Sequence, residues 1–165
     1  MKRCCLLLLL ITFLLGIACA ELQENPEGIV MQEDLVLDDF SMMIDSKWVS
    51  KKDEENDAVL FSATSVNHEI VLMVFFSGEG DETKAIETAA FNEYVSGIKR
   101  EETEMINGIN MIFAINADAN SVCVYFSAKN HLYTISLTCR SKKDIVDQLR
   151  DQLHQMMKTV TLNLD

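Results

Sequence analysis

Two segments alternate apolar and polar residues with the period of a β-strand: residues 121–127 and residues 131–139. Lys129-Asn130 separates them, and Asn tolerates the positive φ that a two-residue hairpin turn requires. The turn therefore sets the register of the hairpin by pairing Ala128 with His131. This register places three apolar cross-strand pairs on one face: Phe126 with Tyr133, Val124 with Ile135, and Val122 with Leu137.

The same register places the two cysteines of the hairpin on opposite faces. Cys123 falls on the Thr/Ser face and Cys139 falls on the apolar face. Side chains on opposite faces of a sheet cannot form a disulfide without backbone movement. We therefore expect no Cys123–Cys139 disulfide, although a three- or five-residue turn would reverse the parity and allow one.

Further strands are predicted over residues 35–44, 58–63 and 69–76, with a fourth at residues 111–115. Asp38-Asp39 is expected to form a turn or bulge within the first of these segments. Residues 70–76 are apolar at every position, which is typical of a central strand covered on both faces. Residues 99–104 are interpreted as a charged turn, and Asn107-Gly108 as a hairpin turn or bulge. Residues 104–139 are thus expected to form three consecutive strands.

Two amphipathic helices are predicted, one after each group of strands. The first spans about residues 82–98, with Asp81 as N-cap, and the second starts with Ser141 as N-cap. The expected buried stripe of the first helix is Ile86, Ala90, Phe91, Tyr94, Val95 and Ile98, and the small residues at 85, 89 and 90 are expected to allow a close approach to a sheet. That of the second is Ile145, Val146, Leu149, Leu153, Met156, Met157 and Val160.

These elements follow the order β-β-β-α-β-β-β-α. The simplest architecture that buries both helix stripes is an α+β fold, a mostly antiparallel β-sheet with helices packed on both faces (an α/β/α sandwich). We expect a single domain over residues 35–165.

The first twenty residues differ from the rest of the chain. Lys2-Arg3 precedes an apolar run of about a dozen residues, too short to span a membrane comfortably, so residues 1–20 are predicted to be a signal peptide. Two processing routes remain open: cleavage after Ala20 by ordinary signal peptidase, or lipidation of Cys19, whose preceding residues resemble a bacterial lipobox. Residues 21–34 are interpreted as an acidic flexible tether.

The charge of the chain narrows the classes of partner. The formal net charge is −12, and removing residues 1–20 removes two of the 14 basic residues and no acid, which leaves 12 against 26, or −14. No basic surface is expected for nucleic acid, or for anionic lipid headgroups. Membrane attachment is therefore expected only through a lipid on Cys19. The expected partner is an unidentified protein or small ligand of the cell envelope.

No catalytic, cofactor or metal site is predicted. His68, His131 and His154 lack the spacing of zinc ligands. Cys123 is the one candidate nucleophile, for an exported thiol or hydrolytic enzyme, but a strand cysteine is more often a small core residue. Lys47 and Trp48 are candidates for a contact surface if Trp48 is exposed, whereas a core role is the commoner one for a tryptophan.

The chain resembles the PsbP/DcrB-like family of small α/β/α sandwich proteins over about residues 35–160. The resemblance rests on the order of elements and on an opening motif, an aromatic-x-apolar strand that runs into a proline followed by a tryptophan. Here Phe40 to Ile44 is followed by Asp45, where proline is usual, and then by Trp48. Members of this family are often exported or lipid-anchored and are mostly non-catalytic. The resemblance thus implies an exported binding or assembly domain and assigns no site residues.

Overall fold

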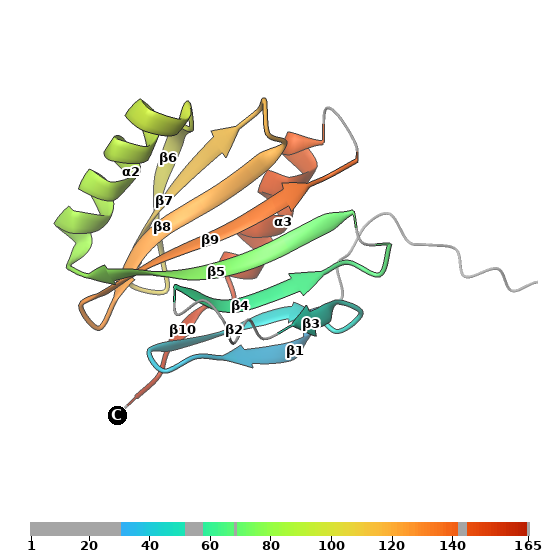
Figure 1. Cartoon of the computed structure of the whole chain (residues 1–165). Helices are drawn as coiled ribbons and strands as arrows, with labels where there is room; N and C mark the ends of the chain where they lie inside the picture. The colour runs from blue at the N-terminus through green and yellow to red at the C-terminus, as the bar shows by residue number, and fades with distance from the viewer. Residues whose placement is uncertain (1–30, 52–57, 68, 142–144, 165) are drawn as a thin grey trace, which may run out of the picture.

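A seven-stranded antiparallel sheet carries the two helices on opposite faces (Figure 1). The structure is a computed structural model and describes residues 31–51, 58–67, 69–141 and 145–164. The strand order is β3-β4-β5-β9-β8-β7-β6. The bounds along that order are β3 (Val49–Lys51), β4 (Val59–Thr64), β5 (Ile70–Glu79), β9 (His131–Cys139), β8 (Ser121–Ala128), β7 (Ile109–Asn116) and β6 (Lys99–Ile106).

A second, three-stranded sheet packs below the large one in Figure 1. Its order is β1-β2-β10, with β1 (Met31–Val36), β2 (Phe40–Asp45) and β10 (Thr161–Leu162). Phe40 of β2 makes edge contacts with Phe126 and Tyr133, so this small sheet covers the same face of the large sheet as α3 (Val146–Met157). The other face carries α2 (Glu82–Ser96), which lies over β6, β7, β8 and β9.

The predicted fold class and the β8–β9 register are confirmed. Phe126, Val124 and Val122 pair with Tyr133, Ile135 and Leu137. Lys129 and Asn130 both have positive φ, as a two-residue turn of this hand requires. Cys123 and Cys139 are free and belong to separate clusters on opposite faces of the sheet, as the register predicted.

Several strands differ from the prediction. The turn expected at Asp38-Asp39 is present, but it separates two paired strands, β1 and β2, and β1 begins within the expected tether. The charged turn expected at residues 99–104 is wrong: these residues lie in β6, which pairs with β7 through the Asn107-Gly108 turn. A strand whose side chains are charged and exposed on both faces has no apolar alternation by which to recognise it.

The second predicted helix corresponds to α3, which begins later in the sequence than predicted. It buries the apolar stripe that was predicted for it. Its N-cap is Ile145, which makes no side-chain capping bond, so the assignment of Ser141 as N-cap is wrong. Leu149, Leu153, Met156, Met157 and Val160 are buried, and Ile145 and Val146 pack against the same core. Each fully buried large side chain stabilises the fold by roughly 1.5–3 kcal/mol.

The first helix is rotated relative to the prediction. Asp81 caps it as expected, accepting a 3.1 Å hydrogen bond from the backbone N–H of Lys84. Its buried residues, however, are Ala85 and Ala89, whereas Tyr94 is 89% exposed and Phe91 and Val95 are more than half exposed. The prediction that Phe91, Tyr94 and Val95 are buried is therefore wrong, whereas Ile98 packs against the cluster under the helix and the small residues approach the sheet as expected. Small side chains let the helix axis approach the sheet closely, and the larger apolar residues are left pointing outward.

Candidate functional site

Trp48 is a core residue at the edge of the main hydrophobic cluster. Its side chain is only 9% exposed and packs in the cluster shared by α3 and both sheets. Lys47 is exposed, and its backbone N–H donates to the Asp45 carboxylate across a turn. The condition for the predicted contact surface, an exposed Trp48, is therefore not met.

Cys123 lies beneath α2 and is shielded from solvent. Its Sγ is 3.7 Å from the carbonyl oxygen of Ala114 and 3.5 Å from Tyr125 Oη, both within hydrogen-bonding reach of a thiol. Burial raises the pKa of Cys123 above its ordinary value of 9.0, and the hydrogen bond with Tyr125 opposes this only in part. A protonated, buried thiol is a poor nucleophile. Neither His131 nor His154, the two histidines that the structure describes, is a hydrogen-bond partner of Cys123, so its contacts give no support to a thiol enzyme.

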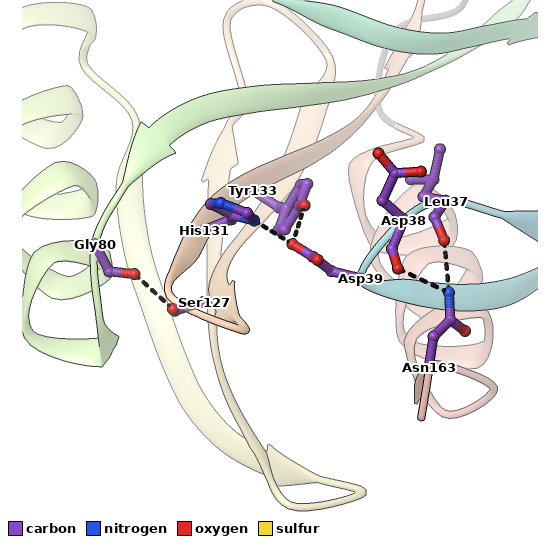
Figure 2. A network of polar contacts seen from close by, with 8 residues as sticks. All are labelled: Leu37, Asp38, Asp39, Gly80, Ser127, His131, Tyr133 and Asn163. Carbon is purple, nitrogen blue, oxygen red and sulfur yellow. Dashed lines mark hydrogen bonds and ion pairs between the residues drawn. The ribbon is translucent and has the colours of Figure 1, made fainter. Parts of the chain in front are cut away.

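A polar cluster that the sequence pattern did not reveal joins the two sheets at Asp39 (Figure 2). The Asp39 carboxylate, buried on the turn before β2, accepts hydrogen bonds from His131 Nδ1 and Tyr133 Oη on β9, each at 2.5 Å. Phe76 packs edge-on against His131, with ring centroids 5.5 Å apart. The aspartate thus holds the end of the β8–β9 hairpin against the small sheet.

The protonation equilibria of this cluster follow from its geometry. Burial alone would raise the pKa of Asp39, but the hydrogen bonds from Tyr133 and His131, with the nearby charges of His131 and Lys129, lower it below its ordinary 3.8. Burial, and then the hydrogen bond and charge of Asp39, raise the pKa of Tyr133 above its ordinary 10.0. Asp39 is therefore an anion and Tyr133 a neutral donor at physiological pH.

The C-terminal residues fix the turn that carries Asp39. The backbone N–H of Asn163 donates to the Asp39 carbonyl oxygen at 3.0 Å. Its side-chain amide donates to the carbonyl oxygen of Leu37 at 2.6 Å, as Figure 2 shows. β10 pairs with β2 directly before this residue. The chain therefore folds its last residues back to hold a turn near its start.

The Asp39–His131 pair resembles part of a catalytic triad, but it lacks a nucleophile. An aspartate that orients a histidine through Nδ1 leaves Nε2 as a potential base. Within the described residues, no hydroxyl or thiol is hydrogen-bonded to Nε2 of His131. An open depression of about 470 Å³ beside His131 is lined by Glu79, Gly80, Asp81, Lys84 and Asn130, which supply no paired acid and nucleophile. The geometry is that of a structural link.

The outer face of α2 is the most conspicuous apolar surface of the domain. Phe91, Tyr94 and Val95 are each more than half exposed. Phe91 is three residues from Tyr94 and four from Val95, so these side chains are neighbours on the helix surface, whereas Ile86 lies on the side next to β6. The sequence had marked this stripe as the face to be covered, and in the described residues of the isolated chain nothing covers it.

His154 lies on α3 and makes specific contacts with the large sheet. Its ring stacks on Phe113 with centroids 3.9 Å apart, its Nε2 lies 2.8 Å from Glu102, and its Nδ1 lies 3.4 Å from Glu104. Arg150 of the same helix reaches Glu101 at 3.5 Å. These contacts fasten α3 to the edge strand β6. His68 lies outside the described residues, as does the candidate lipidation residue Cys19.

Two absences apply to the part of the chain that the structure describes. No group of three His, Cys, Asp or Glu side chains in it is close enough to hold a metal ion. No helix within residues 31–51, 58–67, 69–141 and 145–164 is long and apolar enough to cross a membrane.

Comparison with known proteins identifies the fold. No family model matches the chain, and no curated protein matches its sequence. The solution structure of cyanobacterial PsbP (CyanoP) from Synechocystis sp. PCC 6803 is similar, with a TM-score of 0.57 at 11% identity, over 84% of this chain and 96% of that one. A crystal structure from Bacteroides thetaiotaomicron covers 76% of this chain and 46% of its own, but its TM-score of 0.44 at 12% identity is too low to support an argument. The similarity to CyanoP confirms that the chain has the PsbP-like α+β fold that its element order and opening motif had indicated.

Proposed function

We propose that the chain is an exported, non-enzymatic domain that binds or assembles with another protein in the cell envelope or outside it. The observation that carries this proposal is the outward apolar face of α2. A helix that buries two alanines and exposes a phenylalanine, a tyrosine and a valine leaves a contiguous apolar patch in water. Such patches on soluble domains commonly mark protein interaction sites.

Three further observations support the proposal. Asp39 and His131 are arranged as a structural link, and the Cys123 thiol is protonated and buried, so neither gives a working nucleophile. The strongly acidic chain disfavours nucleic acid as the partner. The apolar run of residues 1–20 supports export, and the PsbP-like fold agrees with the binding or assembly role that the sequence resemblance implied.

The proposal is tested by affinity capture from envelope extracts of the native host, with the mature protein as bait. The test variant is Phe91→Ser combined with Tyr94→Ser, and the matched control is Val49→Ser, which removes an exposed apolar side chain from β3. We expect one partner to be retained by the native protein and by the control, and lost with the double variant. Equal retention by all three proteins, or no enriched partner, would argue against the proposal.

Export and its route are tested by the intact mass of the mature protein from soluble and membrane fractions. A soluble species that begins at Glu21 would establish simple cleavage. A membrane species that begins at a lipidated Cys19 would establish a lipoprotein and would direct the search to partners on the same membrane. A full-length species that retains residues 1–20 would contradict export.

A further inference from the structure

The edge strand β6 and helix α2 together form a groove on the side of the sheet away from α3. The groove has a volume of about 320 Å³ and is lined by Ile86 and Glu93 of α2, by residues 100–103 of β6, and by Ile112 of β7. Met105, also on β6, is 63% exposed. A helix beside an exposed strand edge is a geometry in which an extended peptide can add a strand and place side chains under the helix.

The backbone of β6 has polar groups available for such an addition. β6 ends the strand order, so no strand in the described part of the chain lies on its outer edge. The Asn107-Gly108 turn makes Ile106 and Ile109 a hydrogen-bonded pair, and Glu104 with Met111 is the next such pair. Met105 lies between these two pairs, and Thr103 lies beyond them. Both residues therefore direct their backbone N–H and C=O groups toward the open edge.

The two sides of β6 differ in chemistry. Thr103 pairs with Ile112, which packs beneath α2, so Thr103 and Met105 lie on the groove side. Glu102 and Glu104 lie on the α3 side, where they contact His154. Both carboxylates are close to half exposed. An added strand would therefore meet the apolar Met105 and Ile86 next to the Arg100–Glu93 ion pair on the groove side, and the acidic Glu102 and Glu104 on the other side.

The acidic side disfavours a second copy of the chain as the occupant. In a symmetric dimer, two copies of β6 would pair antiparallel about a two-fold axis. Residues whose backbone N–H and C=O groups face the open edge must then lie opposite each other, so the axis passes through a single residue position. An axis at Glu101, Glu102 or Glu104 places that glutamate opposite itself, and an axis at Thr103 places Glu102 opposite Glu104. An axis at Met105 avoids this repulsion but pairs only residues 104–106 before the Asn107-Gly108 turn. Like charges directly opposite each other destabilise a strand pair, so a partner of opposite charge is favoured.

We propose that the groove between β6 and α2 binds an extended protein segment of about five residues with alternating apolar and basic side chains, added as a strand to the edge at residues 102–106. The apolar side chains pack against Met105 and Ile86, and the basic side chains face Glu102 and Glu104. The β-bulge between Arg100 and Glu102 ends the regular edge and limits the length of the added strand. This inference rests on the proposed binding function and names a second surface next to the apolar face of α2.

The test is direct binding of synthetic peptides to the mature chain, followed by fluorescence anisotropy. The probe is a blocked seven-residue peptide of alternating valine and lysine. The controls are the same peptide with glutamate in place of lysine, and the lysine peptide with alternate backbone nitrogens methylated. We expect the lysine peptide to bind with an affinity that falls as salt rises, and both controls to bind at least about tenfold more weakly.

Two sets of variants locate the site. Thr103→Pro removes an outward N–H without removing a bond to β7, so it should weaken the lysine peptide at least about tenfold, whereas Thr103→Val should change its affinity less than about twofold. Glu102→Gln combined with Glu104→Gln should weaken binding and remove most of its salt dependence, and Glu87→Gln, on the outer side of α2, should not. If Thr103→Pro fails to fold, Glu102→Gln combined with Glu104→Gln still tests whether the peptide binds at this site.

Several outcomes would overturn this inference: equal binding of the lysine and glutamate peptides, unchanged binding to Thr103→Pro and to the Glu102/Glu104 variant, or no binding at about 1 mM peptide. A dimer in solution that Thr103→Pro dissociates would also overturn it, because a second copy would then occupy the edge. If the peptide fails while Phe91→Ser with Tyr94→Ser still abolishes partner capture, the inference fails and the proposed binding function stands.

Discussion

Tyr133 donates a 2.5 Å hydrogen bond to Asp39, a residue 94 positions earlier in the chain, and this contact crosses from the large sheet to the small one. His131, two residues earlier on the same strand, donates to the same carboxylate oxygen. One buried carboxylate therefore receives two donors from β9 while its turn is held by Asn163. Because the link depends on one ionised carboxylate, its contribution to the free energy of unfolding can be measured by substitution and by changing the pH.

Asp39→Asn should lower the free energy of unfolding at pH 7 by about 2–4 kcal/mol, because the charged acceptor of two buried hydrogen bonds is lost. The folded-state pKa of Asp39 is depressed, so its contribution is present above the unfolded value near 4 and is lost as the pH falls through the folded value. Urea unfolding between pH 7 and pH 2 checks this. The native protein should lose more stability on acidification than the variant.

Asp38→Asn is the matched control for that experiment, since Asp38 is the exposed neighbour on the same turn. It should change stability by less than about 0.5 kcal/mol at pH 7. Equal effects of the two substitutions would show that the Asp39 link contributes nothing beyond the general charge of the turn.

Tyr133 and Tyr125 should ionise later than ordinary tyrosines when the folded protein is titrated with base. Burial is the first cause in both cases, reinforced by Asp39 for Tyr133 and by Cys123 for Tyr125. A raised folded-state pKa means that the stabilisation is complete below the unfolded value near 10 and is lost as the pH rises through the folded value. Ultraviolet absorbance of phenolate measures the titration. Tyr125→Phe with Tyr133→Phe should remove its high-pH part, and an unchanged curve would contradict the buried hydrogen bonds.

Neither domain cysteine should react with an alkylating reagent in the folded mature protein. Cys123 and Cys139 are both buried, and burial keeps Cys123 protonated. After unfolding in guanidinium, both should be labelled, and the intact mass should be the same with and without reductant apart from the label. Rapid labelling of Cys123 in the native state would reopen the thiol-enzyme alternative.

The parts of the fold that the sequence predicted well depend on local periodicity. The hairpin register of β8 and β9 follows from a period of two and a two-residue turn, and both are local properties of the chain. The stripe of α3 follows equally from a period near four residues. β6 was missed because its exposed, charged side chains carry no alternation, although its position at the sheet edge explains that composition.

The link at Asp39 could not be found from the sequence, because its partners lie more than 90 residues away and a lone aspartate in a turn carries no distinguishing signal. The contacts of His154 with Phe113 and Glu102 are equally non-local. For α2 the pattern identified the apolar residues but wrongly placed the largest of them against the sheet. A stripe predicts that a helix face will be buried, whether in the domain itself or against a partner.

The last prediction tests the orientation of α2 by comparing three substitutions. Ala89 has no exposed surface and lies against the sheet, so Ala89→Leu should destabilise the domain by about 1–3 kcal/mol through overpacking. Ala90→Leu makes the same increase in volume on the neighbouring, less enclosed side and should cost clearly less. Tyr94→Ser should change stability by less than about 0.5 kcal/mol, because the side chain is in solvent.

Urea denaturation of the three variants distinguishes the observed orientation from the one expected from the apolar stripe. If Tyr94 were buried, its truncation would cost about 3–5 kcal/mol, as large aromatic-to-small substitutions in a core do. That result, with a tolerated Ala89→Leu, would place the stripe against the sheet and remove the apolar patch on which the proposed function depends. A sensitive Ala89 together with a neutral Tyr94 would instead leave the stripe available to a partner.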